Sequence, residues 1–372
     1  MVIGVLKEQA PETRVSLVPE VVAQFVKMNV TVYIEDGAGE RAFFSNSSYT
    51  DAGASIKDAA SVAKEADILL SFHPQNVPAQ IKSGAIVVGV FQPLFQSVMM
   101  KEWASKGWTV FSMDMIPRTT RAQAMDVLSS QANIAGYKAV LLAAFQYSRY
   151  FPMFMTAAGS IAPAKVLILG AGVAGLQAIA TARRLGAVVE VFDTRPAVKE
   201  EVMSLGAKFV EVEGAADASK AGGYAVEQSE EFQQKQKAKI HEHAKKSDII
   251  ITTAQIPGRK APILITKEMI EDMRAGSVII DLASVTGGNT DLTKDCETIM
   301  HKGVTIIGNS ALPATTSSDA SKLYSKNMLN FLKLIINKEG SINLNWEDDI
   351  VKGSCMAHDS KIVNDRLQAL IS

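Results

Sequence analysis

The sequence predicts an α/β protein of two domains, each with a parallel sheet covered by helices. Short apolar runs of strand length alternate with helical stretches in both halves of the chain. One such run, Val166–Leu169, meets a glycine-rich turn that opens a helix, and a second strand follows. With 372 residues, the chain is also long for a single hydrophobic core.

The first domain is expected to be a Rossmann-like unit with a parallel sheet. Its helices are expected at Pro19–Met28, Ala59–Ala66 and Pro78–Ser83. No glycine fingerprint occurs in this stretch of the chain, so the domain is not expected to bind a dinucleotide by itself. The expected strands are Val2–Leu6, Val30–Ile34, Ile68–Phe72, Ala85–Val90 and Trp108–Ser112.

Two long helices are expected to join the domains. The Ala-, Leu- and Gln-rich segment Gln123–Tyr150 leads into the second domain, and Lys322–Ile336, with apolar residues at helical spacing, returns to the first. A short strand, Ile342–Asn345, is expected after it. We therefore assign residues 1–128 and 318–372 to the first domain and residues 129–317 to the second.

The second domain repeats the strand–helix pattern and contains one long polar insertion. Further strands are expected at Ile249–Thr253, Val278–Leu282 and Val304–Ile307, each ending at the sheet edge where ligands bind. The insertion, residues 213–243, contains Gly222-Gly223-Tyr224 and then a highly polar run. It is either a mobile flap with a polar helix or a solvated connection, and composition does not separate the two.

The glycine-rich turn is a G-x-G-x-x-G motif between strand and helix. Gly170 permits the tight turn, Gly172 lets the backbone approach a pyrophosphate, and Gly175 lets the helix pack on the strand. The helix N-terminus offers unpaired N–H groups and roughly half a positive charge to phosphates. Asp193 ends the second strand, 18 residues after Gly175, and is placed to accept hydrogen bonds from an adenosine ribose. The acid favours NAD over NADP, although Arg195 could pair with a 2′-phosphate.

Glycines at this spacing also occur in ordinary strand–helix turns. Here strand, glycines, helix, second strand and acid follow one another in order, which favours a dinucleotide site.

The composition excludes several classes of partner. The chain carries 38 basic and 39 acidic residues, so no net field recruits nucleic acid or an anionic membrane. Cys296 and Cys355 are the only cysteines; they leave one disulfide open but imply no metal site and no disulfide framework. The N-terminus lacks the charged head and apolar core of a signal peptide. We expect a cytoplasmic protein without direct membrane insertion.

The segment Arg118–Gln131, RTTRAQAMDVLSSQ, is unusually polar for a crossing between domains. Gln123, Asp126 and Ser130 stand at helical spacing and are expected to share a face. One interpretation is a capped, salt-bridged helix start with Thr120 as N-cap. The other is a site that orients a nicotinamide by its carboxamide without acid–base chemistry. The residues alone leave both open.

Several motifs occur together in a known family: RTTRAQAMDVLSSQANIAGY, MTAAGSIAPAKVLILGAGVAGLQAIATARRLGA, FDTRP, AGGYA and GSVIIDLA. With them the chain resembles the NAD(H)-binding component of proton-translocating nicotinamide nucleotide transhydrogenase, from ETRVSLVPE near the N-terminus to the return helix. The resemblance implies Si-specific/Re-specific transfer of a hydride from NADH, bound in a cleft between the two domains, to NADP(H) on a partner component. A membrane-spanning component couples the transfer to proton translocation. The family also implies a homodimer, docked through its partners on the cytoplasmic face of the inner membrane.

The resemblance assigns roles to individual residues. Gln123 reaches toward both nicotinamides at the transfer site, where two equivalent rings exchange a hydride without a general acid or base. The other catalytic candidates, at the nicotinamide end of NAD(H), are Arg118, Asp126 and Ser129, with Thr120 in the same loop. The remaining predicted contacts are Gly170, Gly172, Val173 and Gly175 at the pyrophosphate, Asp193, Thr194 and Arg195 around the ribose, Gly223, Tyr224 and Gln236 on the flap, and Gln255. Family members usually carry Leu at position 255, so adenine-side affinity is in doubt unless that contact is through backbone.

Alanine dehydrogenase is the nearest alternative, since it shares the two-domain layout and the ETRVSLVPE-like start. That family's catalytic lysine and histidine correspond to Leu70–Pro74 and Val90–Pro93, where no lysine occurs and Gln92 replaces the histidine. We interpret His73 as a surface residue beside Pro74. Without an acid–base pair, oxidation of an amino acid is not expected. A nucleotide-binding module without chemistry is the other alternative, but it needs no polar constellation at Arg118–Gln131.

Overall fold

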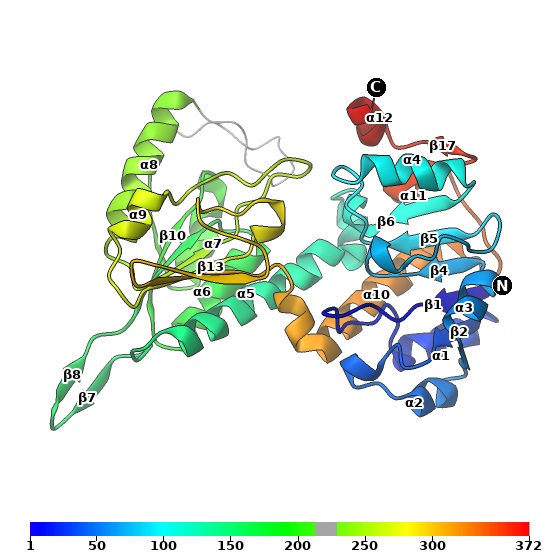
Figure 1. The fold of residues 1–372 in the computed structure, drawn as a ribbon, viewed down its shortest axis with the longest axis horizontal. Coiled ribbons are helices and arrows are strands. Elements are labelled where there is room, and N and C mark those ends of the chain that lie inside the picture. Colours follow the sequence, from blue (N-terminus) through cyan, green and yellow to red (C-terminus); the bar gives the residue numbers. More distant parts are fainter. Residues whose placement is uncertain (213–228, 372) are drawn as a thin grey trace. The chain divides into compact units, whose positions relative to one another are not determined.

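The computed structural model describes residues 1–212 and 229–371 and divides the chain into two compact units. Unit 1 comprises Met1–Gln131 with Ala314–Ser372, and unit 2 comprises Ala132–Pro313. Each unit has its own sheet and its own hydrophobic core (Figure 1). The expected α/β class with two Rossmann-like sheets is thereby confirmed.

Unit 1 contains an eight-stranded sheet in the order β17-β16-β6-β5-β4-β1-β2-β3. The strands from β6 to β3 are parallel, and β16 and β17 add an antiparallel edge. Their bounds are β1 Val2–Val5, β2 Thr31–Glu35, β3 Ser55–Lys57, β4 Ile68–Leu70, β5 Ile86–Gly89, β6 Thr109–Ser112, β16 Cys355–His358 and β17 Lys361–Ile362.

Helices cover both faces of the unit 1 sheet because apolar residues alternate in direction along buried strands. Val88 of β5 packs with α1 and α10, whereas its neighbour Val87 packs with α4 on the other face. The helices are α1 Pro19–Lys27, α2 Asn46–Asp51, α3 Ala59–Glu65, α4 Ser97–Ser105, α10 Ser317–Ile335, α11 Asp349–Ser354 and α12 Asp365–Ile371, with short 3-10 turns η1 Glu40–Ala42, η2 Pro74–Asn76, η3 Met113–Met115, η4 Thr120–Met125 and η7 Leu312–Thr316.

Unit 2 contains a seven-stranded sheet in the order β11-β10-β9-β12-β13-β15-β14, in which only β14 is antiparallel among the described strands. One face packs against α5, α6 and α7, and the other against α8 and α9. The strand bounds are β9 Lys165–Leu169, β10 Val188–Phe192, β11 Lys208–Phe209, β12 Ile249–Thr252, β13 Val278–Asp281, β14 Glu297–His301 and β15 Val304–Gly308.

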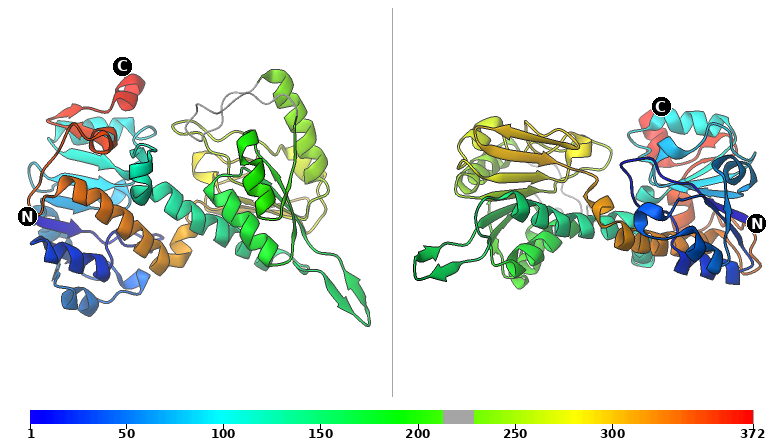
Figure 2. Two further views of the ribbon diagram at one scale, coloured as in Figure 1. Left: turned by 180° about the vertical axis from the view of Figure 1, so that it is seen from behind. Right: turned by 60° about the horizontal axis from the view of Figure 1, so that its bottom comes forward.

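The helices of unit 2 include α5 Val127–Gln146, which begins in unit 1, and α6 Val173–Arg184 after β9. A two-stranded hairpin, β7 Phe154–Thr156 and β8 Gly159–Ile161, projects from unit 2 in every view (Figures 1 and 2). The other elements are α7 Lys199–Ser204, α8 Glu230–Ala244, α9 Lys267–Glu271 and the 3-10 turns η5 Pro196–Val198 and η6 Ser284–Thr286.

Three expected elements are wrong or shifted. Pro78–Ser83 is not helical, because only a few residues separate Pro78 from Gly84, whose φ of +70° ends any helix. Ile342–Asn345 is not a strand; Ile342 makes only an isolated bridge to Ile336. The long helix begins at Val127, after a separate 3-10 turn, and ends at Gln146.

Among the described residues, no helix combines the length and the apolarity needed to cross a membrane.

Candidate functional site

The loops after β9 and β12 meet at the switch point of the unit 2 sheet. β9 pairs with β10 on one side and with β12 on the other, and the two halves of the sheet extend in opposite directions from this pair. In open α/β sheets, ligands bind beyond the carboxyl ends of strands at such a point. Gly170-Ala171-Gly172 follows β9 here, and Thr253-Ala254-Gln255 follows β12.

Each glycine of the turn has its own structural reason. Gly170 has a φ of +106°, a region that favours glycine. A Cβ on Gly175 would overlap the carbonyl oxygen of Gly170 and lie 2.9 Å from its carbonyl carbon. Gly172 has an ordinary φ of −79°, and a Cβ there would meet no atom of the described residues within 4 Å. Gly170 and Gly175 are therefore required by the backbone conformation and the close backbone packing of the turn. Gly172 is required by neither, and it leaves open space beside the turn.

The N-terminus of α6 lacks a side-chain cap. Gly172 is its N-cap residue, and the first turn contains no acidic side chain. The first N–H groups of the helix are thus left for an external acceptor. Val173, the first helical residue, is partly exposed. An uncapped helix N-terminus beside the open space at Gly172 fits the pyrophosphate of a dinucleotide.

The carboxylate of Asp193 binds the glycine turn to the end of β10. Its Oδ2 accepts from the Ala171 N–H at 2.7 Å, and its Oδ1 accepts from the Arg195 N–H at 2.8 Å. The Arg195 guanidinium adds two bonds, from Nε at 2.9 Å and from Nη2 at 2.7 Å. The hydrogen bond to Asp193 raises the pKa of Arg195. In the sequence, Asp193 favours NAD, whereas Arg195 could pair with the 2′-phosphate of NADP. In the structure these two side chains bind each other.

Arg195→Gln is expected to sharpen discrimination against NADPH. Without the guanidinium, the charge of Asp193 repels a 2′-phosphate uncompensated, so NADPH affinity falls by roughly tenfold or more while NADH affinity changes less. Fluorescence titration with both nucleotides measures the ratio. Arg184→Gln, which removes the same charge from an exposed position at the end of α6, is the control. An unchanged or higher NADPH affinity in Arg195→Gln would contradict this role.

Asn289, which the sequence reasoning missed, fixes the loop after β12. Its Oδ1 accepts from the Ala254 N–H at 3.0 Å, and its Nδ2 donates to the Ala254 carbonyl at 2.9 Å and to that of Pro262 at 2.8 Å. The buried Asp281 accepts from the Asn289 N–H at 2.6 Å. Thr253 Oγ1 in turn donates to the Gly170 carbonyl at 3.1 Å. A buried polar network therefore connects the core of the sheet to the glycine turn.

The other predicted contacts of unit 2 lie in different surroundings. Gln255 Nε2 donates to the Leu282 carbonyl at 3.2 Å, and Thr194 is half-buried beside Asp193. Gln236 is half-buried in the middle of α8. Gly223 and Tyr224 lie outside the described residues.

The predicted nicotinamide residues of unit 1 lie on two elements. Gln123 belongs to η4, whereas Asp126 caps α5: its Oδ1 accepts from the Ser129 N–H at 2.9 Å and its Oδ2 from the Ser129 hydroxyl at 2.6 Å. Thr120 is therefore not the cap of the long helix, and the prediction of Thr120 in that role is wrong. The single shared helical face is also wrong, because Gln123 lies on η4 and Ser130 on α5, where Ser130 Oγ donates to Asn327 of α10 at 2.7 Å.

Arg118, Thr120 and Gln123 are exposed. In the described ranges, no side chain forms a hydrogen bond with the Gln123 carboxamide. An exposed amide on a well-held turn is available to an external ligand, as the resemblance implies.

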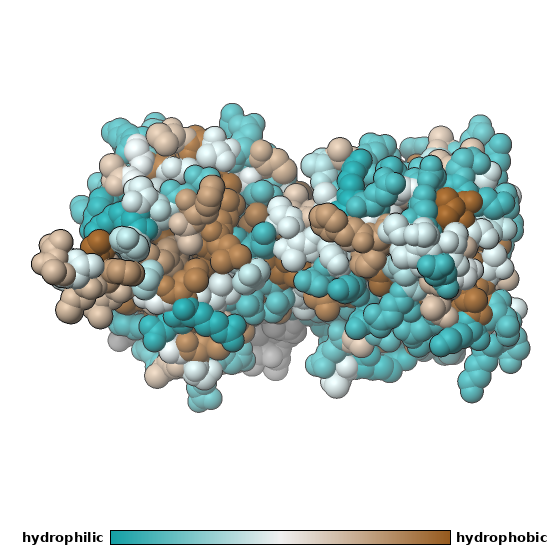
Figure 3. All heavy atoms as spheres, turned by 90° about the horizontal axis from the view of Figure 1, so that it is seen from below, coloured by the Kyte–Doolittle hydropathy of each residue, from teal (hydrophilic) through white to brown (hydrophobic). Residues whose placement is uncertain are grey.

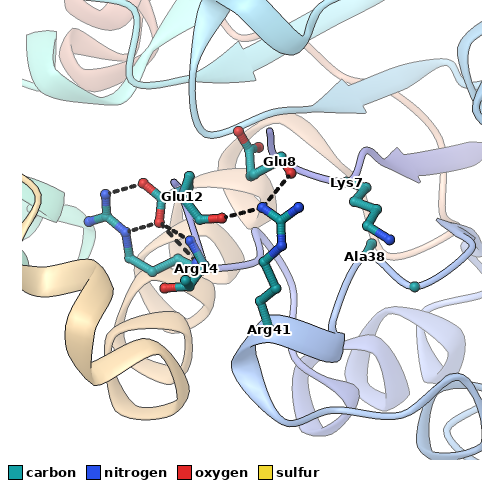
Figure 4. A pocket seen from close by; sticks show the side chains of 8 residues that line it. Lys7, Glu8, Glu12, Arg14, Ala38 and Arg41 are labelled. Carbon is teal, nitrogen blue, oxygen red and sulfur yellow. Dashed lines mark hydrogen bonds and ion pairs between the residues drawn. The ribbon is translucent and has the colours of Figure 1, made fainter. Parts of the chain in front are cut away.

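A second polar cluster, which the sequence reasoning also missed, is buried in unit 1 (Figure 4). Arg14 donates to Glu12 through Nε at 2.8 Å and Nη2 at 2.6 Å, and through Nη1 to Gln131 at 2.9 Å. His73 Nε2 lies 2.8 Å from Glu12 Oε2 while its side chain is 40% exposed, so the expected surface residue also pairs with this buried cluster. Burial by itself would raise the pKa of Glu12, but the bonds from Arg14 and His73 outweigh it and hold that pKa well below its usual range.

Glu8, next to this cluster, is buried and accepts hydrogen bonds from the Phe72 N–H at 2.5 Å and from Asn76. Desolvation raises the pKa of Glu8 from 4.5 to about 7 despite these donors.

The raised pKa of Glu8 predicts a pH-dependent stability. The folded state retains a proton that the unfolded state releases above pH 4.5, so this contribution is complete below pH 4.5 and is lost as the pH rises through about 7. The free energy of unfolding of the wild type minus that of Glu8→Gln should fall by about 3 kcal/mol across this range. Urea titrations at several pH values measure how this difference in the free energy of unfolding changes with pH. The pH-independent effect of replacing the carboxyl group with an amide does not alter that change. A flat difference would contradict the raised pKa.

Within the described ranges of the chain, no group of three or more His, Cys, Asp or Glu side chains is arranged to hold a metal ion. Cys296 and Cys355 are both free thiols.

Comparison with known proteins identifies the family to which this chain belongs. The family model "Alanine dehydrogenase/PNT, N-terminal domain" matches residues 4–135, and "Alanine dehydrogenase/PNT, C-terminal domain" matches residues 139–365. A Rhodospirillum rubrum protein, named as the first portion of NAD(P) transhydrogenase subunit alpha, is 44% identical over 379 residues, which cover 99% of both chains. A crystal structure of transhydrogenase from Sinorhizobium meliloti superposes with a TM-score of 0.88 at 43% identity, covering 98% of this chain and 100% of that one.

An L-alanine dehydrogenase has a TM-score of 0.82 at 23% identity, with 100% of this chain and 99% of that chain covered, which shows a common fold alone. The match to the Rhodospirillum rubrum protein extends over almost the whole of both sequences. The chain therefore belongs to the alanine dehydrogenase/PNT family and, within it, to the alpha subunits of NAD(P) transhydrogenase.

Proposed function

We propose that this chain is the NAD(H)-binding component of a proton-translocating transhydrogenase and that hydride passes directly from NADH to NADP⁺ on a partner component. The observation that carries the proposal is the open space at Gly172 beside the uncapped N-terminus of α6. The exposed Gln123 on η4 supports it, since direct transfer needs an orienting amide and no acid or base.

Bound NADH supplies the hydride, and the chain binds and orients it. The first N–H groups of α6 and the backbone of Gly172 hold the pyrophosphate, and Asp193 with Arg195 marks the ribose side. Asp126 and Ser129, together with Arg118, hold the nicotinamide end. In this role Asp126 keeps the Ser129 hydroxyl in one orientation through their bond of 2.6 Å. Gln123 then sets the position of the transferring ring, and exclusion of water protects the hydride.

Partners complete the proposed enzyme. The Rhodospirillum rubrum relative is named as one portion of one subunit, which supports the presence of further components. We propose that one of them binds NADP(H) and that another spans the membrane. We propose that these partners dock the chain on the cytoplasmic face of the inner membrane and that the membrane component couples transfer to proton translocation.

The occupant proposed for the β7–β8 hairpin is a second copy of this chain in a homodimer. Isolated two-stranded hairpins are marginally stable in water. The hairpin nevertheless exposes Met155 at 75% and also Phe154, and Met153 on the preceding segment is exposed as well. Figure 3 shows apolar side chains gathered on this side of unit 2. A second chain packed there would remove this apolar surface from water.

The test is a nucleotide titration followed by a transfer assay. The full chain is titrated with NADH by fluorescence, and an NADP⁺-loaded partner component is then added while NADPH formation is followed. Binding followed by transfer supports the proposal. Binding without transfer supports a nucleotide-binding module, and NAD-dependent alanine oxidation by the chain alone supports a dehydrogenase.

A further inference from the structure

Arg121 forms a bidentate ion pair with the C-terminal segment of unit 1. Its Nη1 donates to Asp348 Oδ2 at 2.6 Å and its Nη2 to Asp348 Oδ1 at 2.8 Å, and Nη2 also donates to Asp349. The two ends of the pair are 227 residues apart in the chain. Arg121 lies on η4, two residues before Gln123. The bidentate geometry fixes the orientation of the guanidinium as well as its distance.

Asp348 is a firm anchor because it is also the N-cap of α11. Its Oδ1 accepts from the Ile350 N–H at 2.9 Å and from the Val351 N–H at 3.3 Å, and both of these residues are fully buried. α11 packs closely on the chain that leads into η4, since a Cβ on Gly353 would lie 2.5 Å from Pro117 Cγ. The bonds from Arg121 lower the pKa of Asp348, which keeps the carboxylate charged.

The other end of η4 is tethered as well. The Ala124 carbonyl accepts from Asn327 Nδ2 at 2.9 Å and from Asn330 Nδ2 at 3.1 Å, both on α10. Gln123 therefore stands between two anchored residues. In the described ranges, its own carboxamide forms no hydrogen bond with the protein. The backbone of the turn is held, while the side chain is left available.

A contribution to the stability of the fold does not explain the ion pair between Arg121 and Asp348. Arg121 is half exposed, and exposed ion pairs contribute little to stability. What a bidentate pair adds at such a position is orientation. A shift of about 1 Å in a positioning group can slow transfer by roughly a hundredfold.

We propose that Arg121 is a positioning residue for hydride transfer: with Asp348 and Asp349 it fixes η4 so that the Gln123 carboxamide is already oriented when NADH and the partner bind. This inference rests on the proposed function. It assigns to the C-terminal segment of the chain a role in the transfer step, although that segment touches no nucleotide in the proposal.

The experiment compares Arg121→Gln, Arg121→Lys and Asp348→Asn in the full chain with saturating NADP⁺-loaded partner. Asparagine is a good N-cap, so Asp348→Asn keeps the cap of α11 while it weakens the ion pair. Arg121→Lys keeps the positive charge but cannot form the bidentate pair with Asp348. We expect single-turnover transfer to slow by roughly tenfold or more in Arg121→Gln and less in the other two. NADH affinity and the thermal midpoint should stay close to those of the wild type.

Two further readouts separate positioning from general damage. The Arg121→Gln/Asp348→Asn double variant should be no slower than Arg121→Gln, since both changes remove one interaction. The Ala122 and Asp126 amides donate to the Thr119 and Gln123 carbonyls at the two ends of η4, and their hydrogen exchange should accelerate in Arg121→Gln. Lys82→Gln, which breaks the surface pair with Asp67 elsewhere in unit 1, should leave transfer unchanged.

Transfer at the wild-type rate in Arg121→Gln would overturn the inference, as would a loss that merely follows a fall in NADH affinity or thermal midpoint. A wild-type chain that binds NADH but transfers no hydride would instead refute the proposed function. The wild type is measured first, so the two failures are distinguishable.

Discussion

Gly175→Ala is expected to unfold or severely destabilise unit 2 and to abolish NADH binding with it. The added Cβ would overlap the Gly170 carbonyl oxygen and lie 2.9 Å from the carbonyl carbon, and neither atom can move without shifting β9 or α6. Alanine favours a helix over glycine by about 1 kcal/mol, but overpacking against backbone costs about 3 kcal/mol or more. The clash therefore outweighs the helix propensity. Circular dichroism during urea titration measures the loss.

Gly172→Ala is the matched comparison, three residues earlier in the same motif. Its φ of −79° suits alanine, and within the part of the chain that the structure describes the new Cβ meets no atom within 4 Å. Stability should change by no more than about 1 kcal/mol, as for the exchange of a weak N-cap. NADH affinity should nevertheless fall by roughly tenfold or more, because the methyl group fills the space that a pyrophosphate needs. Unchanged affinity in a stable Gly172→Ala chain would remove the turn from the nucleotide site.

The second large effect is expected at Gln123. Gln123→Asn keeps the carboxamide but shortens its reach by one methylene, so the amide no longer sets the reacting ring at the required position. Single-turnover hydride transfer to the NADP⁺-loaded partner should slow by roughly ten- to a hundredfold, with NADH affinity nearly intact. Stopped-flow absorbance after reconstitution measures the rate, and fluorescence titration measures the affinity.

Gln80→Asn, the same exchange at an exposed position of unit 1, controls for the chemistry of the substitution and should transfer hydride at the wild-type rate. If Gln123→Asn also transfers at that rate, Gln123 has no role in the mechanism. A large loss of NADH affinity in Gln123→Asn would instead make it a binding residue.

The region of the fold that sequence predicts best is the one that local interactions determine. β9, α6 and β10 follow one another without insertion, and Gly175 is required by its contact with Gly170, five residues earlier. The strands β3, β16 and β17, at the two ends of the unit 1 sheet, were missed because none has the run of large aliphatic residues that marks β4 or β5. The start of α5 was misplaced, since Thr120 and Asp126 are both acceptable caps and only the bonds to Ser129 decide between them.

The buried polar networks could not be predicted from short stretches of sequence for a different reason. His73 and Glu12 lie 61 residues apart in the chain, and Arg14 and Gln131 lie 117 apart. No pattern in a sequence window relates such residues, because the fold alone brings them together. Asn289 also gave no local signal, since it lies eight residues after the end of β13, beyond η6, and 35 residues from the Ala254 backbone that it holds.

The full set of donors around Asp193 has a consequence for the energetics of nucleotide binding. A carboxylate offers about four acceptor positions, and four protein N–H groups already point at this one. A ribose hydroxyl can therefore bind Asp193 only by replacing one of them, which exchanges one hydrogen bond for another and adds little net free energy. The adenosine ribose would then select among nucleotides without tightening the complex much, and most of the affinity would come from the phosphates and the two bases.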